Sequence, residues 1–358
     1  MQHRYFAASN SAQGFKNYYP EVFAPCDLLY IIKGGPGTGK STFMKKYAHI
    51  AEKAGDEIEY YYCSSDPDSL DGVLIFGKDR TVGILDGTAP HVREPELPGV
   101  REEIVNLGEC WDGELLRRQK NEIVSLCDRK SAEYKSAYRF LRSVGNLRAV
   151  CNGLVEESLD REKMKSAVSR LIKDIPLGNA EIKVSIVDSV SMSGRVRLTS
   201  FEDNAEKLYI VSEFYGVEEM FLDELFLSLK ERDVKMRVSH DPICTEHIDG
   251  IFLENEKIAF VTSAGISEKY ETDGGQDEGE ERADDEKKAE IINPKRFVDM
   301  EALRDIRNEL RYTCRLAQSS LDGALHSLSK AKIYHFLLED IYGKAMDWKK
   351  LENIKIIL

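Results

Sequence analysis

Apolar and polar residues are distributed along the chain in a pattern that predicts an α/β fold. Residues 28–32 form a continuous apolar run, which is typical of a strand buried on both faces of a sheet. Apolar residues then fall at helical spacing from Phe43 to Ala54, and Gly55 follows where a helix commonly ends. This segment predicts a strand, a loop and a helix in that order.

Two further segments predict β-hairpins. Each begins with an Asp-Gly pair, which is followed by an apolar run, a charged turn and a second apolar run. The runs are 73–76 and 82–85 in the first segment, and 251–253 and 258–261 in the second. Charged segments with an apolar stripe, at about 112–176 and 296–355, predict a helical arm after each hairpin.

These landmarks form an internal repeat. Leu-Tyr-Ile-Ile at 29–32 recurs as Leu-Tyr-Ile-Val at 208–211, and Asp-Gly at 71–72 recurs at 249–250. Ala137 and Leu141 in the first arm align with Ala324 and Leu328 in the second, at a constant separation of 187 residues. We therefore predict two homologous domains, 1–185 and 186–358, each with a mostly parallel sheet and a helical arm.

Composition and charge narrow the classes of protein. Among 358 residues, 63 acidic side chains exceed 50 basic ones, and the net charge of −13 disfavours binding to nucleic acid or anionic lipid. The seven cysteines are widely spaced without a Cys-x-x-Cys pair, so we expect reduced thiols. Because the chain has neither a signal-like apolar start nor an apolar run of about 18 residues, we expect a cytoplasmic protein without membrane contact.

The segment 268–290 supplies over half of this negative charge. It contains eleven acidic and four basic residues with little apolar content, so it cannot offset the entropy that ordering would cost. We expect a disordered insertion, and the alternative is an acidic docking segment for a basic protein partner. The helical arms are a second candidate surface for a protein partner, through coiled-coil pairing.

The candidate chemistry is concentrated in one motif. Residues 34–41 read Gly-Gly-Pro-Gly-Thr-Gly-Lys-Ser, a match to the P-loop pattern G-x-x-x-x-G-K-[ST] between the predicted strand and helix. We expect the loop amides and the helix N-terminus to bind the phosphates of ATP, and Lys40 to reach the β and γ phosphates. The predicted nucleotide-binding residues are Gly34, Gly35, Gly37, Thr38, Gly39, Lys40, Ser41 and Thr42. The motif thus predicts sheets of the P-loop NTPase type.

A P-loop also requires a carboxylate that supports Mg²⁺. The apolar run 82–85 leads directly into Asp86. A residue at the carboxyl end of a buried strand lies at the edge where open α/β sheets bind ligands. We therefore expect Ser41 and Asp86 to support Mg²⁺.

Neighbouring segments supply further candidate catalytic groups besides Lys40. Asp66 follows the predicted strand 58–62 and is a candidate for orienting water or deprotonating an acceptor hydroxyl, although Asp-Pro is also common in turns. Thr88 and His91 follow Asp86 and are candidate sensors of the γ phosphate. The candidates for charge stabilisation are Arg80, Arg93 and Arg101.

The second half has lost the motif. When Tyr209 is aligned with Tyr30, Glu219 replaces Lys40 and one glycine remains in the loop. The counterpart of Asp86 is Val261 or Thr262 on this alignment. We therefore expect no phosphate binding in the second half.

The chain resembles an uncharacterised bacterial family of tandem P-loop ATPases. The resemblance rests on KGGPGTGKSTFMKK at 33–46, YYYCSSDPDSLDGV at 60–73 and ILDGTAPH at 84–91, and it extends over nearly the whole chain. It implies nucleotide binding by residues 34–42 and Mg²⁺ support from Asp86. Many members keep a P-loop in both halves, and this chain departs from that pattern.

Three functions are consistent with these residues. The first is Mg²⁺-dependent binding and hydrolysis of ATP, favoured over GTP because the chain has no Asn-Lys-x-Asp segment. The second is a P-loop kinase with Asp66 acting on an acceptor hydroxyl, because Gly87 rather than glutamate follows Asp86. The third is a nucleotide-gated binding protein without turnover.

Overall fold

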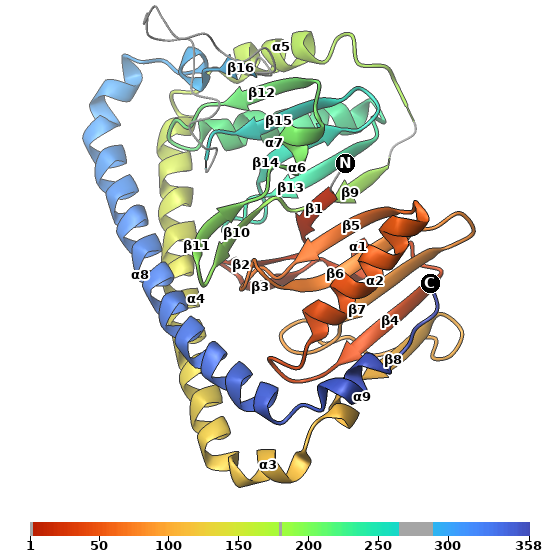
Figure 1. Cartoon of the computed structure of the whole chain (residues 1–358). Coiled ribbons are helices and arrows are strands. Elements are labelled where there is room, and N and C mark those ends of the chain that lie inside the picture. Colours follow the sequence, from red (N-terminus) through yellow and green to blue (C-terminus); the bar gives the residue numbers. More distant parts are fainter. Residues whose placement is uncertain (1–2, 179–180, 265–288) are drawn as a thin grey trace, which may run out of the picture. The chain divides into compact units, whose positions relative to one another are not determined.

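The computed structural model describes residues 3–178, 181–264 and 289–358, which contain two six-stranded sheets (Figure 1). Contacts between residues divide the chain into two compact units. The first unit comprises Met1–Leu141, Ser189–Val196 and Leu321–Leu358, and the second comprises Arg142–Asp188 and Arg197–Ser320. These units are discontinuous in sequence, unlike the predicted domains 1–185 and 186–358, because each long arm helix contributes residues to both.

The first sheet has the strand order β1-β5-β6-β7-β4-β8. Its strands are β1 (His3–Phe6), β4 (Leu28–Lys33), β5 (Glu57–Tyr62), β6 (Leu70–Phe76), β7 (Thr81–Asp86) and β8 (Glu102–Asn106). β6 alone runs against the other five strands. The carboxyl ends of those five strands and the amino end of β6 therefore meet at one edge of the sheet.

The predicted strand, loop and helix are confirmed at β4 and α2 (Lys40–Ala54). The helix begins after Gly39 and ends at Gly55, and both glycines have the left-handed backbone conformation that a side chain disfavours. Phe43, Met44 and Tyr47 are buried on the face of α2 that packs against β5 and β6.

The second sheet repeats this topology. Its order, read from the opposite end, is β9-β13-β14-β15-β12-β16, and β14 alone runs against the others. The strands are β9 (Ile182–Val184), β12 (Lys207–Val211), β13 (Met236–His240), β14 (Ile248–Leu253), β15 (Ile258–Thr262) and β16 (Ala289–Ile292), and α7 (Val217–Glu231) follows β12. The α/β prediction, the duplication and both predicted hairpins are confirmed. β9 already belongs to the second sheet, so that sheet begins before the predicted boundary at 185/186.

Smaller elements also occur in pairs. A two-stranded ribbon and a short helix precede the first buried strand of each half: β2 (Ala8–Ser11), β3 (Gly14–Asn17) and α1 (Tyr19–Val22) in one, and β10 (Asp188–Ser191), β11 (Gly194–Arg197) and α6 (Ser200–Asn204) in the other. The short helices η1 (Leu107–Cys110) and η3 (Pro294–Phe297) follow β8 and β16. The duplication therefore extends beyond the landmarks that the sequence preserves.

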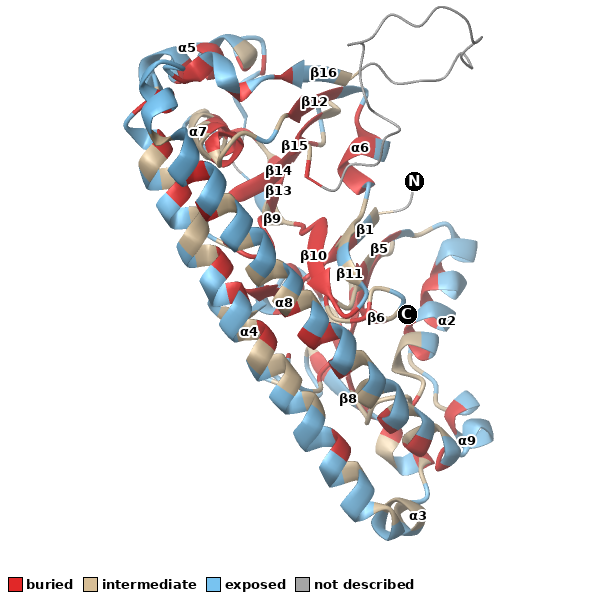
Figure 2. Ribbon diagram, turned by 90° about the vertical axis from the view of Figure 1, so that its left-hand side faces the viewer, coloured by how far each residue is buried: buried red, intermediate tan, exposed pale blue. Residues whose placement is uncertain are grey.

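Both predicted helical arms are present. The first contains α3 (Gly113–Arg118), α4 (Lys120–Glu156) and α5 (Arg161–Leu171), and the second contains α8 (Ala302–Lys344) and α9 (Trp348–Glu352). In the first unit, Leu126 of α4 packs with Leu338 and Ile341 of α8. Buried positions recur along both long helices between exposed ones (Figure 2), as expected for a helix seam within the chain.

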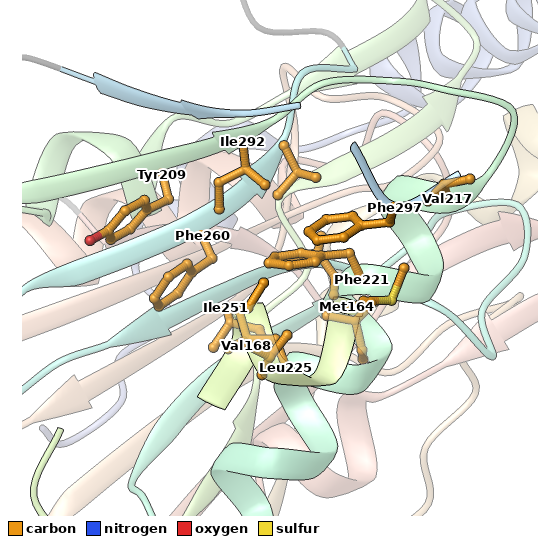
Figure 3. Close-up of a cluster of buried hydrophobic side chains, with 14 of the residues drawn as sticks. Met164, Val168, Tyr209, Val217, Phe221, Leu225, Ile251, Phe260, Ile292 and Phe297 are labelled. Atoms are coloured by element: carbon orange, nitrogen blue, oxygen red, sulfur yellow. The ribbon is translucent and has the colours of Figure 1, made fainter. Parts of the chain in front are cut away.

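Each sheet has its own apolar core. In the second unit, Phe221 of α7 stacks on Phe297 of η3 with ring centroids 5.6 Å apart (Figure 3). Tyr209 of β12 and Phe260 of β15 stack at 4.9 Å on the same sheet. Aromatic pairs of this kind stabilise a core beyond the burial of their area. The second half therefore keeps a complete core despite its altered loop.

Three sequence predictions concern the rest of the chain. Residues 268–288 of the predicted acidic insertion lie outside the described residues, whereas Ala289 and Glu290 belong to strand β16. All seven cysteines are free in the structure. Over the described ranges, no helix combines the length and the apolar character that crossing a membrane requires.

Candidate functional site

A glycine-rich loop (residues 34–39) connects β4 to α2 at the edge where the parallel strands end. Gly37 and Gly39 have φ angles of 66° and 84°, which favour glycine. Thr38 is buried, and its hydroxyl donates a hydrogen bond to the Gly35 carbonyl at 2.8 Å. The loop is therefore held as a tight turn ahead of a 15-residue helix, whose first N–H groups have no partner within the helix.

Lys40 is the first residue of α2, and its side chain folds back over the loop. Its Nζ donates to the carbonyl oxygens of Gly34 at 3.1 Å and Gly35 at 2.7 Å. The same Nζ lies 3.4 Å from Oδ2 of Asp86. β7 pairs in parallel with β4, with Asp86 opposite Ile32, so the two strands deliver the ammonium and the carboxylate to one place.

Asp86 is buried and its carboxylate is oriented by Thr88. Oδ1 accepts hydrogen bonds from the Thr88 N–H at 2.9 Å and the Thr88 hydroxyl at 2.6 Å. Thr88, a predicted sensor of the γ phosphate, therefore holds Asp86 in place. Oδ2 is left to face Lys40.

Ser41 and Thr42 differ in their surroundings. The Ser41 hydroxyl oxygen accepts a hydrogen bond at 3.0 Å from the N–H of Leu70, the first residue of β6. Thr42 is exposed on the first turn of α2. The Ser41 oxygen is thus fixed between α2 and the sheet edge that carries Asp86.

A buried polar cluster centred on Asp71 lies beside Asp86. Oδ2 of Asp71 accepts a hydrogen bond from the Tyr19 hydroxyl at 3.2 Å and lies 3.2 Å from Nε2 of His91. Nδ1 of His91 lies 2.7 Å from the main-chain oxygen of Asp86. The Cys63 thiol also donates to Asp71. The sequence analysis used Asp71 only as a repeat landmark and missed this role.

The protonation states of His91 and Asp71 depend on the contact between these two side chains. Burial by itself lowers the pKa of His91, but the charge and hydrogen bond of Asp71, together with Asp86, outweigh burial and raise it to about 8. Burial raises the pKa of Asp71, but the charge of His91 and the three donors outweigh it, and the net pKa is lowered. At neutral pH the pair is therefore an imidazolium and a carboxylate. Both N–H groups of His91 are then donated, which leaves no lone pair for a base.

Asp71, Asp86 and His91 also form the one group of potential metal ligands within the described part of the chain. One ligand atom from each lies within 4.8 Å of the others. The imidazolium already supplies positive charge to this cluster, and Lys40 supplies more to Asp86. The cluster therefore holds its own counter-cations.

Asp66 lies where the sequence placed it, in the buried turn after β5. Its carbonyl oxygen accepts a hydrogen bond from the Ser69 N–H at 2.9 Å. The N–H groups of Asp66 and Ser65 lower the pKa of the Cys63 thiol, although burial outweighs them and raises it. The residue thus belongs to the same sheet edge as Asp86 and also shapes the turn.

The three candidate arginines are engaged elsewhere. Arg80 donates to the Ile357 carbonyl at 3.3 Å. Arg93 forms an ion pair with Glu102 at 3.0 Å. Arg101 donates to the carbonyls of Phe23, Ala24 and Cys26. Each arginine therefore fixes a loop of the first unit.

Helices α8 and α9 cover the glycine-rich loop within the first unit. A Cβ built on Gly37 would lie 2.5 Å from the main-chain oxygen of Glu339, and the Gly37 N–H lowers the pKa of the Glu339 carboxylate. A Cβ built on Gly35 would lie 2.7 Å from the Tyr342 ring, and one on Gly39 would lie 3.1 Å from the Trp348 ring. Only an apolar stripe marked this part of the chain in the sequence analysis, because these residues lie 302 to 309 positions from the loop glycines that they contact.

The corresponding loop of the second half is shorter. From Ile32, paired with Asp86, seven residues precede α2, whereas from Val211, paired with Thr262, five precede α7. Thr262 is therefore the counterpart of Asp86. Gly216, with φ 86°, takes the place of Gly39, so Val217 stands at the lysine position. The predicted alignment of Glu219 with Lys40 is wrong, because it assumed loops of equal length.

An arginine of the first arm pairs with an acidic residue on the first turn of α7, the helix that follows this altered loop. Arg148 of α4 donates to both carboxylate oxygens of Asp241, at 2.8 and 2.9 Å, and to Glu219. A Cβ built on Gly216 would lie 2.0 Å from Oδ1 of Asn152. In the second unit, the guanidinium of Arg148 therefore pairs with two carboxylates beside α7, the helix that corresponds to α2.

Asp249, the counterpart of Asp71, has a different electrostatic environment. It is buried in the second unit, and burial raises its pKa to about 7. The charge of Arg197 opposes this shift, and the charges of Asp188 and Asp241 add to it. The contrast with Asp71 follows from the lack of a histidine partner among the groups that shift Asp249.

We expect the second unit to lose stability as Asp249 ionises. The folded pKa of about 7 exceeds the ordinary value of 3.8, so this contribution is fully present below pH 3.8 and is lost as the pH rises through 7. The free energy of unfolding should fall by up to about 1.4 kcal/mol per pH unit in this range. Urea unfolding of Asp249→Asn at pH 5 and pH 8 should show a smaller pH difference than wild type. Exposed Asp174→Asn is the control, and equal pH differences in all three proteins would contradict the prediction.

The structure brings Lys40, Ser41, Asp86 and His91 to one sheet edge, and Asp66 to the turn beside it. The chain matches no protein-family model, no curated protein and no solved structure. Any assignment of function therefore depends on the residues and geometry described above.

Proposed function

We propose that the chain binds Mg²⁺·ATP at the glycine-rich loop of the first unit and hydrolyses it, as a P-loop NTPase with one competent site. The observation that carries the proposal is the ammonium of Lys40 lying 3.4 Å from the Asp86 carboxylate, at the end of a strand–glycine loop–helix segment. This combination is what polyphosphate binding with a divalent cation requires.

The loop supplies the phosphate contacts. Main-chain N–H groups around Gly37 and Gly39 and the first turn of α2 present positive partial charge to an anion. Lys40 now bonds to two loop carbonyls, and in the proposed complex its ammonium exchanges these for phosphate oxygens.

The residues present fit Mg²⁺. Asp86 has one carboxylate oxygen held by Thr88 and a second that faces a cation, and Ser41 presents a hydroxyl oxygen. Hard oxygen ligands of this kind are those that Mg²⁺ prefers. Ser41 and Asp86 would hold the ion, and the ion when bound neutralises charge on the phosphate oxygens.

The proposal assigns turnover to the first unit alone. The second loop lacks the lysine and is two residues shorter, and the first turn of the helix after it carries Glu219, which pairs with Arg148 of α4. The free thiols support a reducing compartment, and we propose the cytoplasm.

Calorimetry and phosphate release test the function. Purified full-length protein with MgCl₂ should take up one ATP per chain and release inorganic phosphate without an added acceptor. Uptake without release would favour the kinase or the nucleotide-gated binding protein. Absence of ATP and GTP uptake at millimolar concentration would refute the proposal.

Replacement of Asp66 by asparagine separates an effect on the chemical step from an effect on ATP binding. We expect Asp66→Asn to lower kcat by about 10²-fold while ATP binding is retained, because a base or water-orienting group contributes about 10² to 10⁴ in rate. The buried position of Asp66 at the ligand edge favours this role, and it is also the observation that favours a kinase. Exposed Asp68→Asn in the same turn is the control. A kcat within about twofold of wild type would leave Asp66 with a turn-forming role only.

A further inference from the structure

An acidic side chain of α8 lies on the glycine-rich loop. The Gly37 N–H lowers the pKa of the Glu339 carboxylate, the backbone of Glu339 lies against Gly37, and Oε1 of Glu339 lies 3.5 Å from Nε2 of His335 one turn earlier. The hydrogen bond to His335 is the largest of the effects that lower the pKa of Glu339, with further contributions from Gly37 and Lys40. The residue is therefore a carboxylate at neutral pH.

The contact leaves no room between helix and loop at this point. A Cβ built on Gly37 would lie 2.5 Å from the main-chain oxygen of Glu339 and 2.7 Å from its Cα. An N–H that donates to Glu339 cannot at the same time donate fully to a phosphate oxygen. The Gly37 N–H therefore interacts either with Glu339 or with a nucleotide phosphate, and not with both at once.

The side chains around Glu339 carry positive charge, which would also attract a phosphate bound at the loop. Lys40 acts on Glu339 from the loop, and Lys130 of α4 interacts electrostatically with both Lys40 and Glu339. Burial is the largest effect on Lys130 and lowers its pKa. When the Glu339 carboxylate leaves, the repulsion between these two ammonium groups is opposed by one anion fewer, Asp86 remaining beside Lys40, and this favours entry of another anion.

The second half also brings an arm helix to its loop, but the charges of the arm residue and of its partners are reversed. Arg148 and Asn152 precede His335 and Glu339 by the arm separation of 187 residues. Arg148 pairs with Glu219 on the first turn of α7, and Asn152 lies against Gly216 of the second loop. There, a basic arm residue meets acidic groups. In the first unit, an acidic arm residue meets amides and a lysine. Contact between arm and loop is thus a feature of both halves, and the arm's charge complements the loop in each.

We propose that Glu339 is an intramolecular competitor for the phosphate site, so that the C-terminal part of α8 must withdraw from the loop before Mg²⁺·ATP binds. This inference depends on the proposed nucleotide function. It makes binding and the position of α8 mutually dependent: ATP releases the helix end, and any partner that holds the helix end in place lowers the affinity for ATP.

Titration calorimetry with Mg²⁺·ATP tests the competition. Glu339→Gln keeps the shape but replaces a charge-assisted hydrogen bond with a weaker one, and Glu339→Ala removes the contact. We expect both variants to bind ATP at least about tenfold more tightly than wild type, because the binding-competent fraction rises. Asp340→Asn is the matched control, because the side chain of Asp340 is 57% exposed and forms an ion pair with Lys344 on the next turn of the same helix. Its affinity should stay within about twofold of wild type.

The outcomes separate this inference from the proposed function. Equal or weaker ATP binding by both Glu339 variants, with wild type binding, would overturn the competition and leave the nucleotide function intact. Failure of wild type and all variants to bind would overturn both. Hydrogen exchange of residues 339–344 in wild type gives a second measure, and we expect faster exchange on adding Mg²⁺·ATP. Unchanged exchange with bound ATP would contradict withdrawal of the helix.

Discussion

Replacement of Lys40 by alanine is expected to reduce phosphate release from Mg²⁺·ATP by at least about 10²-fold. The ammonium is the cation closest to both the loop carbonyls and Asp86, so its loss removes the charge that would meet the β and γ phosphates. Asp86 would also lose its ion pair with Lys40 and face the phosphates without that cation. Steady-state phosphate release and calorimetric affinity for Mg²⁺·ATP measure the two losses separately.

A matched variant on the same helix controls for folding and net charge. Lys45 is exposed on α2 and donates to the Asp68 carbonyl at 3.1 Å, away from the loop. Lys45→Ala should keep wild-type turnover. Phosphate release that survives Lys40→Ala undiminished would mean that the activity arises at another site or in another protein.

Conversion of Asp86 to asparagine is expected to remove the dependence of turnover on Mg²⁺ and to lower turnover by about 10²-fold or more. Asparagine can still accept the two hydrogen bonds from Thr88, so the loop after β7 should remain in place. The change therefore isolates the negative charge. Phosphate release measured across a MgCl₂ titration gives the result.

The Asp86→Asn variant should behave differently when Mg²⁺ is left out, and this shows whether the carboxylate acts through the ion. Binding of ATP without Mg²⁺ should be equal to or tighter than in wild type, because a carboxylate beside the phosphates has been removed. Asp79→Asn, in the exposed turn between β6 and β7, should leave both measurements unchanged. An Asp86→Asn protein with wild-type Mg²⁺ dependence would show that another residue supports the ion.

The amino-acid sequence was sufficient to predict the helices and strands whose formation depends on residues close together in the chain. The apolar run before Gly34 and the helical spacing after Lys40 are local patterns, and they predicted β4 and α2. Asp86 could be placed beside the loop because parallel strands deliver their carboxyl ends to one edge. The hairpins and the duplication followed from the same kind of local pattern, repeated along the chain.

Two errors of the sequence analysis have definite physical causes. Asp71 was missed because it is the second residue of the antiparallel strand β6, and the rule about carboxyl ends does not cover a strand that starts at the ligand edge. Glu219 was misaligned with Lys40 because a fixed separation fails across loops of unequal length. The register of β12 with β15 was needed to identify Thr262 and Val217 as the true counterparts.

The amino-acid sequence by itself determined which residues can carry charge and turn the backbone at the loop: the glycines, Lys40 and the acid that ends β7. Only the tertiary structure decided what those residues contact. It joined His91 to Asp71, Arg148 to Asp241, and Glu339 to Gly37, across separations of 20, 93 and 302 positions. Such pairs leave no periodicity in the chain, because they form when separate elements pack and bring together partners that no local pattern links.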